Sequence, residues 1–167
     1  MKPSIQQIIE TLDLEPLEME GGYFTRTYTS SDKAKFNIRS KEETRPTASA
    51  IYYLLTPDTH SKIHCLPTDE VYHFYLGDPV ELLLLKEEGD AQVVELGTNI
   101  LENEKPQFVV SKNIWQGSRL KSGGEFALLG TTMAPAFEYS DFEVPGDLEQ
   151  LLKSYPKTFH ELINTLF

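Results

Sequence analysis

The residues best suited to chemistry lie in the stretch 60–77, which holds three of the four histidines of the chain beside two acids. His64 and Glu70 are the candidate catalytic residues within it. Imidazole and carboxylate groups transfer protons and also bind metal ions. Without a metal, this pair could move a proton at a carbon next to a carbonyl group. The pair therefore indicates either acid–base chemistry or a divalent metal site.

His73 follows Glu70 by three residues. On a regular strand this odd offset sends the two side chains to opposite faces, unless a bulge intervenes. A structural role is therefore favoured for His73, although we keep it as a candidate ligand-binding residue. His60 is expected in an exposed loop and His160 on the surface of a C-terminal helix.

The segment 20–29 combines two glycines with an aromatic and β-branched run, which predicts a turn that leads into a strand. Arg26 then lies between Phe24 and Tyr28 on one strand face, where its guanidinium could bind a carboxylate or phosphate. The alternative is an exposed strand face. Further candidates for ligand binding each carry a carboxylate, phenol, indole or amide group: Glu20, Tyr23, Tyr53, Trp115 and Gln116.

The aromatic candidates and Gln116 each have an expected role. Tyr23, Tyr28 or Tyr53 could act as a phenolic acid beside His64. Trp115 would add an apolar wall, although core packing is the commoner fate of a lone tryptophan. Gln116 can both donate and accept hydrogen bonds, which suits a polar organic ligand.

Strand signals recur at short intervals from residue 48 onward and are separated by proline, glycine or acidic turns. About ten short strands in a row predict a sandwich or barrel. Apolar residues at helical spacing predict a short helix after Pro3 and two helices after residue 147, separated by Pro156. Residues 31–46 are polar and predict a long loop. Residues 137–142 alternate aromatic and polar side chains, which predicts a half-buried strand without chemistry.

The composition excludes several classes of protein. The 26 acidic and 15 basic residues give a net charge of −11, so no basic stripe is present for nucleic acid. The 167 residues suit one domain, 1–167. No apolar run is long enough for a membrane span and no signal peptide is evident. The single cysteine, Cys65, fits a reducing environment, and we expect a cytoplasmic protein.

Several segments together resemble an uncharacterised cupin family, of the cupin-5 type, that is related to the rhamnose-pathway sugar epimerases. The most specific are Glu20-Gly-Gly-Tyr23, Asp69-Glu-Val-Tyr-His73 and Trp115-Gln116, with support from residues 50–56, 106–110, 128–135, 137 and 141–142. The resemblance covers nearly the whole chain. It implies a mainly β fold, the double-stranded β-helix or cupin jelly roll, of about ten strands with a short N-terminal helix and C-terminal helices. It also implies at least a homodimer.

The sequence departs from the general cupin pattern at two expected metal ligands, where Leu66 and Gln116 stand in place of histidines. His64 and Glu70 alone leave the site incomplete, because catalytic zinc usually has three protein ligands and comparable iron sites use two histidines and a carboxylate. We therefore predict no cofactor. The alternative is a metal-dependent cupin enzyme, an oxygenase or isomerase, with a divalent metal on His64 and Glu70.

The resulting functional prediction is a cupin that binds a small polar, carbohydrate-like or anionic metabolite in its barrel. The resemblance implies that any catalysis is isomerase or epimerase chemistry. No local pattern fixes the His and Asp pair of the related epimerases. A third hypothesis, a non-catalytic binding or assembly protein, stays open because a fold does not dictate an activity.

Overall fold

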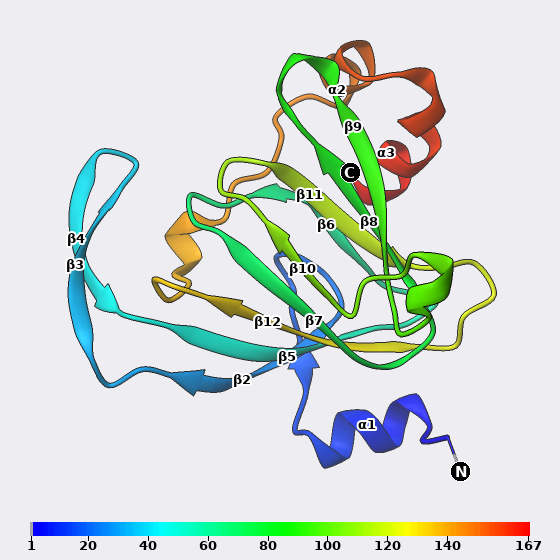
Figure 1. Cartoon of the computed structure of the whole chain (residues 1–167), viewed down its shortest axis with the longest axis horizontal. Helices are drawn as coiled ribbons and strands as arrows, with labels where there is room; N and C mark the ends of the chain where they lie inside the picture. The colour runs from blue at the N-terminus through cyan, green and yellow to red at the C-terminus, as the bar shows by residue number, and fades with distance from the viewer. Residues whose placement is uncertain (1) are drawn as a thin grey trace.

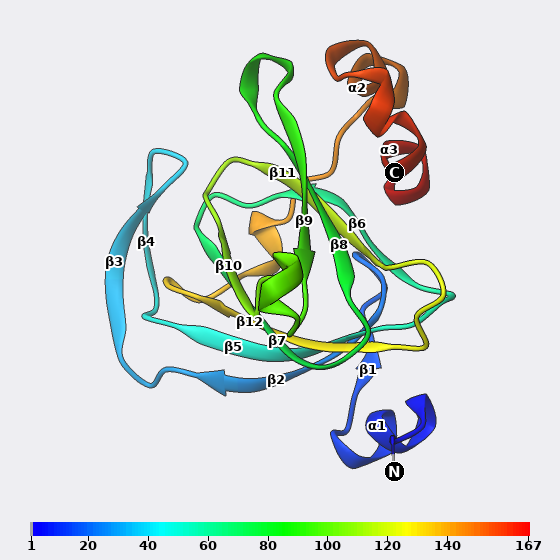
Figure 2. The ribbon, with the colours of Figure 1, turned by 45° about the vertical axis from the view of Figure 1, so that its right-hand side comes forward.

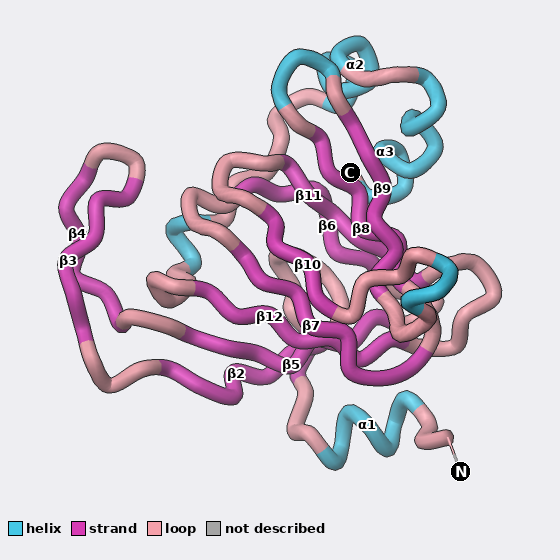
Figure 3. The backbone as a smooth tube through the Cα atoms, viewed as in Figure 1, coloured by secondary structure: helices cyan, strands magenta, loops and turns pink. Residues whose placement is uncertain are grey.

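The computed structural model describes residues 2–167, in which antiparallel strands form the body of the molecule and helices lie at its edges (Figures 1 and 3). The larger sheet has the order β1 (Glu15–Pro16), β2 (Tyr23–Thr29), β5 (Ser49–Leu55), β12 (Ala127–Met133), β7 (Glu70–Gly77) and β10 (Gln107–Val110). The smaller sheet has the order β6 (His60–Cys65), β11 (Trp115–Leu120), β8 (Val80–Leu85) and β9 (Ala91–Leu96). The predicted mainly β fold is confirmed.

The main core lies between the two sheets, because alternate residues of each strand point to opposite faces. Tyr53, Tyr72 and Leu129 from the larger sheet meet Leu82 and Leu84 from the smaller one, and all five are buried. This core fixes the position of the larger sheet relative to the smaller sheet. Side chains near one end of the barrel can therefore be brought together from distant parts of the chain.

Helices cover parts of the outer surface. Helix α1 (Ile5–Thr11) begins with a capping box between Ser4 and Gln7, and Ile8 packs against Leu54 and Leu128 of the larger sheet. Helices α2 (Leu148–Ser154) and α3 (His160–Leu166) pack on the outer face of the smaller sheet. The remaining helical turns are 3-10 helices: η1 (Glu87–Gly89), η2 (Ile100–Glu102), η3 (Tyr139–Asp141) and η4 (Lys157–Phe159). The predicted N- and C-terminal helices are confirmed. Within residues 2–167, no helix is both long and apolar enough to cross a membrane.

The prediction of a long loop over residues 31–46 is wrong. These residues form a hairpin of β3 (Lys33–Ile38) and β4 (Lys41–Pro46) that stands to one side of the barrel (Figures 1 and 2). Its two-residue turn, Arg39 and Ser40, has positive φ angles of 47° and 64°. Such turns usually contain asparagine or glycine, which this turn lacks, and β4 is mostly charged. Only β3 carries a strand signal, because Ala34, Phe36 and Ile38 alternate with polar residues.

The predicted strand over residues 137–142 is also wrong. The segment contains the 3-10 helix η3, and Oδ2 of Asp141 accepts a hydrogen bond of 3.2 Å from the backbone N–H of Glu138. The alternating pattern arises because Phe137 and Phe142 turn toward the barrel while Glu138 and Ser140 face outward. The segment therefore lies at the mouth of the barrel and not against the C-terminal helices.

Candidate functional site

A cavity of about 50 Å³ lies at one end of the barrel. Its polar lining residues are Glu20, Arg26, Ser49, His64, Glu70 and Thr131. Its remaining wall is formed by apolar and aromatic side chains: Leu17, Met19, Phe24, Ala50, Ile51, Leu66, Met133, Phe137, Tyr139 and Phe142. The structure thus brings both candidate catalytic residues, His64 and Glu70, to one cavity, together with Glu20 and Arg26.

His64 is buried on β6, and its Nδ1 lies 2.8 Å from the backbone carbonyl oxygen of Lys62. A carbonyl oxygen only accepts hydrogen bonds, so Nδ1 carries the proton and donates it. In the neutral ring, Nε2 therefore keeps its lone pair. The ring of Phe142 stacks on the imidazole with a centroid distance of 4.8 Å and an interplanar angle of 19°. These two contacts fix the tautomer and orientation that a general base needs.

Glu70 begins β7, and its side chain accepts a hydrogen bond of 2.8 Å at Oε2 from Nε2 of Gln116. Burial raises the pKa of the Glu70 carboxyl, and the nearby His64 opposes this rise. The charge of Glu20 raises the pKa further, while hydrogen bonds from Thr131 and Gln116 lower it. The net effect is that Glu70 holds a proton at a higher pH than an ordinary glutamate, which suits a general acid.

Glu20 reaches the cavity because the two following glycines make a tight turn. Gly21 has a φ of 110°, and a Cβ at this position would lie 2.1 Å from the backbone oxygen of His60. The carboxylate is then fixed by Ser61, whose Oγ donates a hydrogen bond of 2.5 Å to Oε1 of Glu20. The hydroxyl of Tyr53 donates to the Gly21 oxygen at 2.9 Å. Tyr53 thus stabilises the turn from within the core.

Several tyrosine candidates are not placed as expected. Tyr53 is buried, and burial raises the pKa of its phenol well above the ordinary value, so the group stays neutral. A bulge between Arg26 and Tyr28 shifts the alternation of β2, and Tyr28 points away from the cavity with 54% of its surface exposed. Tyr23 packs beneath helix α1 on the outer face of the sheet. Neither Tyr23 nor Tyr28 lines the cavity.

His73 and Trp115 also lie outside the barrel. His73 pairs in register with Gly130 and Gln107, and its Nε2 lies 3.1 Å from the Oγ1 of Thr132. The expectation that His73 and Glu70 occupy opposite faces is confirmed. Trp115 packs with the apolar residues beneath the C-terminal helices. Its neighbour Gln116 has the opposite orientation and is buried beside Glu70.

The residues present do not fit a three-ligand metal site. In the described part of the chain, residues 2–167, no three His, Cys, Asp or Glu side chains are grouped so as to hold a metal ion. Leu66 lines the cavity, and Gln116 directs an amide nitrogen, a hydrogen-bond donor, at Glu70. In this arrangement the amide nitrogen of Gln116 and the carboxylate of Glu70 form a hydrogen-bonded pair.

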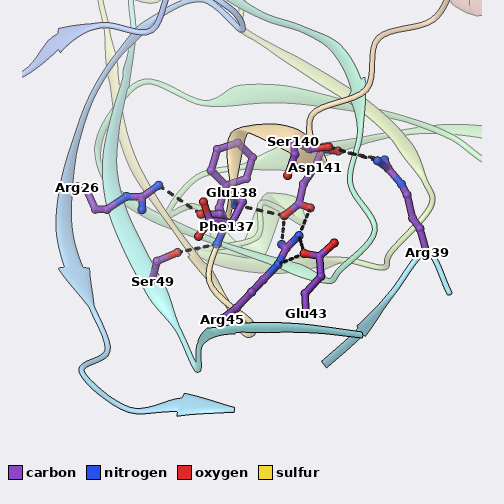
Figure 4. A network of polar contacts seen from close by, with 9 residues as sticks. All are labelled: Arg26, Arg39, Glu43, Arg45, Ser49, Phe137, Glu138, Ser140 and Asp141. Carbon is purple, nitrogen blue, oxygen red and sulfur yellow. Dashed lines mark hydrogen bonds and ion pairs between the residues drawn. The ribbon is translucent and has the colours of Figure 1, made fainter. Parts of the chain in front are cut away.

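Sequence reasoning missed the segment that closes one side of the cavity. Phe137, Tyr139 and Phe142 line it, and Asp141 anchors the segment by a buried ion pair with Arg45 of β4 (Figure 4). Nη1 of Arg45 lies 2.5 Å from Oδ2 of Asp141, and Nη2 lies 2.9 Å from Oδ1. The partners are 96 residues apart, so no local pattern could have identified them.

Arg39 adds a second link between the hairpin and the same segment. It donates hydrogen bonds to the backbone oxygens of Ser140 and Asp141 at 3.4 and 3.1 Å (Figure 4). On the other side of the cavity, Arg26 lies 3.5 Å from the backbone oxygen of Phe137. The β3–β4 hairpin thus holds one wall of the cavity in place.

Comparisons with known proteins match this architecture. A family model described as Cupin superfamily (DUF985) matches residues 6–145. The uncharacterized protein YML079W of Saccharomyces cerevisiae is 29% identical over 149 residues, which cover 83% of this chain and 73% of that protein. A hypothetical protein from Leishmania major has a TM-score of 0.85 and 26% identity, covering 98% of both chains. Protein SO0799 from Shewanella oneidensis has a TM-score of 0.83 and 30% identity, covering 98% of this chain and 97% of that chain. The chain belongs to the DUF985 family of the cupin superfamily.

Proposed function

We propose that this protein binds a small hydroxy-carbonyl compound in its barrel and catalyses an isomerisation or epimerisation by proton transfer. The observation that carries the proposal is that His64, with a free Nε2, and Glu70, with a raised pKa, line the same cavity. In acid–base enzymes, the environments of two titratable groups commonly differ so that one group accepts a proton and the other donates one.

The chemistry requires only these two groups. Nε2 of His64 removes a proton from the carbon next to the substrate carbonyl, while the protonated carboxyl of Glu70 donates its proton to the carbonyl oxygen. The product of this step is an enol. If the enol turns over in the cavity, return of the proton from His64 to the other face of the same carbon, while the Glu70 carboxylate takes back the enol proton, gives the epimer. Return of the proton from His64 to the neighbouring, hydroxyl-bearing carbon, while the Glu70 carboxylate takes the proton of that hydroxyl, gives the isomer. The protons lost and gained balance over one cycle.

The polar groups around the cavity favour a ligand that donates several hydrogen bonds. Glu20 and Nε2 of His64 present acceptor groups, and the Oε1 of the buried Gln116 beside Glu70 has no hydrogen-bond partner within residues 2–167. Hydroxyl groups satisfy such acceptors well. The apolar wall around Phe24 and Phe142 would cover the carbon skeleton.

The cavity volume limits how much of a ligand can be enclosed in the barrel. Because one water molecule needs roughly 10–15 Å³ on this measure, a space of about 50 Å³ accepts on the order of four non-hydrogen atoms. A larger ligand would extend past Arg26 at the mouth, where the guanidinium suits an anionic substituent. This arrangement supports a short sugar-like ligand with its reactive carbonyl end inside.

The proposal is tested by incubating the protein in D₂O with a panel of small hydroxyaldehydes, hydroxyketones and hydroxy acids. Proton NMR then follows deuterium exchange next to the carbonyl. We expect exchange with the wild type and a loss of about 10²–10⁴-fold in His64→Gln and Glu70→Gln. Glu149→Gln on α2 is a matched control, because its side chain is 83% exposed and lies far from the cavity lining.

Other outcomes separate the alternatives. A ligand that raises the melting temperature without any exchange would indicate a binding protein and overturn the catalytic proposal. Exchange that survives in both His64→Gln and Glu70→Gln would do the same. Elemental analysis of protein purified without a metal-affinity tag should give less than one metal ion per ten chains. A stoichiometric metal that His64→Ala removes would instead support the metal-dependent enzyme.

A further inference from the structure

The cavity is lined by one carboxylate and one guanidinium that the fold leaves without an ion-pair partner. These groups belong to Glu20 and Arg26. All four arginines of the chain lie within residues 2–167, and Arg39, Arg45 and Arg119 each pair with a carboxylate. Within the same residues, neither Arg26 nor Glu20 forms an ion pair, with each other or with any other side chain. Unpaired charges beside a cavity are free to complement a charged ligand.

Arg26 keeps most of its hydrogen-bond donors free. Its side chain reaches from β2 toward the segment that closes the cavity, where Nη2 lies 3.5 Å from the backbone oxygen of Phe137 (Figure 4). The guanidinium makes no second hydrogen bond within residues 2–167. Its planar fork of N–H groups matches the two oxygens of a carboxylate. Because Arg26 is exposed, it can bind an acidic group of a ligand at the mouth of the cavity.

Glu20 turns its charge toward the interior of the barrel. Its Oε1 accepts the hydrogen bond from Ser61, which is fully buried. Burial raises the pKa of the core residue Tyr53, and the charge of Glu20 raises it further. The second oxygen, Oε2, accepts no hydrogen bond within residues 2–167. Glu20 therefore offers a free acceptor with a negative charge on the inner side of the cavity.

The two charges lie at different depths in the barrel. Arg26 pairs in register with Ile51 of β5, whereas the turn that carries Glu20 is bonded to Tyr53. Ile51 and Tyr53 are two residues apart, a separation of roughly 7 Å along the strand. The contact with Phe137 extends Arg26 further toward the mouth. A ligand that reaches both groups must therefore be extended, with its ends in different surroundings.

We propose that the ligand is a zwitterion, with an amino group at Glu20 and an acidic group at Arg26. The inference rests on the proposed function, because it names the charged groups of the substrate whose carbonyl end meets His64 and Glu70. A purely anionic ligand would leave Glu20 unpaired, and a purely cationic ligand would leave Arg26 unpaired. A zwitterion pairs both groups and has no net charge, so a chain with a net charge of −11 does not repel it.

The volume of the cavity places the amino group next to the carbonyl. About 50 Å³ accepts on the order of four non-hydrogen atoms, which is enough for the amino nitrogen, the carbonyl group and the carbon that joins them. An ammonium group has three donors and no acceptor, which matches the free oxygen of Glu20. Its positive charge also favours loss of a proton from the joining carbon to His64. The outer chain then passes Phe24 and ends at Arg26.

Four small ketones test the proposal by titration of the full chain, with Kd measured by NMR. Aminolevulinate carries both charges, hydroxylevulinate carries only the carboxylate, aminoacetone carries only the amino charge, and hydroxyacetone carries neither. All four have the same carbonyl group. Because hydrogen bonds to charged groups are among the stronger ones, we expect each charge to lower Kd by about 10-fold or more. Aminolevulinate should therefore bind the wild type most tightly.

Two variants assign the charges to their partners. In Glu20→Gln, Kd should differ by less than about twofold between each amino compound and its hydroxy analogue, while the effect of the carboxylate persists. Arg26→Gln should give the opposite pattern. Glu18→Gln is the matched control for Glu20, because Glu18 lies exposed in the same turn but does not line the cavity. Arg119→Gln is the control for Arg26, and both controls should keep the wild-type preferences.

The wild-type titrations decide the proposal even if a variant fails to fold, which melting temperatures reveal. A wild type that binds none of the four compounds, or binds all four equally, would overturn it. A preference for the amino compounds that survives in folded Glu20→Gln would overturn the assignment to Glu20. The proposed catalysis is judged separately by deuterium exchange. Selective binding without exchange supports the zwitterion and overturns the catalysis, whereas exchange without selective binding has the opposite meaning.

Discussion

Gln116 donates a hydrogen bond of 2.8 Å from Nε2 to Oε2 of Glu70, and both side chains are buried. The two residues belong to different sheets, so this bond joins β11 to β7 across the barrel. It occupies the position at which the cupin resemblance implies a histidine ligand for a metal. The same position thus holds a hydrogen-bond donor that favours the ionised form of Glu70 and opposes the rise of its pKa that burial causes.

Replacing Gln116 by leucine should destabilise the fold by about 1–3 kcal/mol, because Glu70 would keep its burial but lose a hydrogen-bond donor. Chemical denaturation at neutral pH measures the loss. The exposed Gln6 is the control, since its side chain bonds only to Glu10 on the surface of α1 and Gln6→Leu should change the free energy of unfolding by less than ~0.5 kcal/mol. Equal effects of the two substitutions would contradict this account of Gln116.

The raised pKa of Glu70 makes the stability of the fold depend on pH. A carboxyl group whose pKa is higher in the folded than in the unfolded state binds more protons when folded, so its contribution favours folding at low pH. This contribution is complete below the unfolded pKa and is lost as the pH rises through the folded pKa. We therefore expect Glu70→Gln to be more stable than the wild type at neutral pH and to lose that advantage as the pH falls.

The measurement is the difference in free energy of unfolding between the wild type and Glu70→Gln from pH 4 to pH 8. The difference separates the effect of Glu70 from that of groups such as Asp78. A backbone hydrogen bond and Lys2 lower the pKa of Asp78, so its contribution to stability changes with pH in the opposite direction. A difference that does not change with pH would show that Glu70 does not titrate differently in the folded state.

Much of the fold could be predicted because local patterns determine it. The strand alternation and the terminal helices are visible in the sequence, and the odd offset of His73 from Glu70 correctly separated these residues. The bulge after Arg26 leaves no signal in the sequence, so strict strand alternation predicts the wrong face for Tyr28. A bulge depends on the pairing of neighbouring strands, which the residues of one strand do not reveal.

The closing wall of the cavity shows the same limit at longer range. Phe142 stacks on His64, and Asp141 pairs with Arg45 through contacts that depend on the folded topology. In the sequence, Arg45 lies in a charged segment, which predicts a solvent-exposed side chain. The family resemblance predicts His64, Glu70 and Gln116 as site residues, but the residues that position them come from distant parts of the chain and can be identified only from the folded structure.

The pair between Arg45 and Asp141 should be much more important for stability than a surface pair of the same hairpin. Only 3% of the surface of Arg45 and 1% of the surface of Asp141 are exposed. Arg45→Met therefore leaves the buried Asp141 carboxylate without its partner and should lower the free energy of unfolding by about 3–5 kcal/mol. Lys35→Met is the matched control, because the Lys35–Glu42 pair is exposed and should contribute less than ~1 kcal/mol. Thermal or urea unfolding distinguishes the two variants.

The same substitution should also weaken ligand binding, since Asp141 anchors the wall formed by Phe137 and Phe142. For any ligand found in the D₂O screen, we expect a higher Kd in Arg45→Met than in Lys35→Met. If Arg45→Met proves too unstable, Arg39→Ala tests the same wall through the weaker links to Ser140 and Asp141. Unchanged affinity in both variants would show that the hairpin does not position this wall.

The turn at Gly21 provides a test of how Glu20 is positioned. Gly21→Ala combines a φ of 110° with a Cβ only 2.1 Å from the backbone oxygen of His60, so the turn must move. Gly123 is a matched control because it has a φ of 85° but no atom within 4 Å of an added Cβ. Gly123→Ala should cost about 1 kcal/mol from backbone strain alone. Gly21→Ala should cost several times more in urea unfolding and slow the deuterium exchange by weakening substrate binding, because the turn carries Glu20 away from Ser61. Equal costs for the two alanine variants would mean that the close approach to His60 does not constrain the turn.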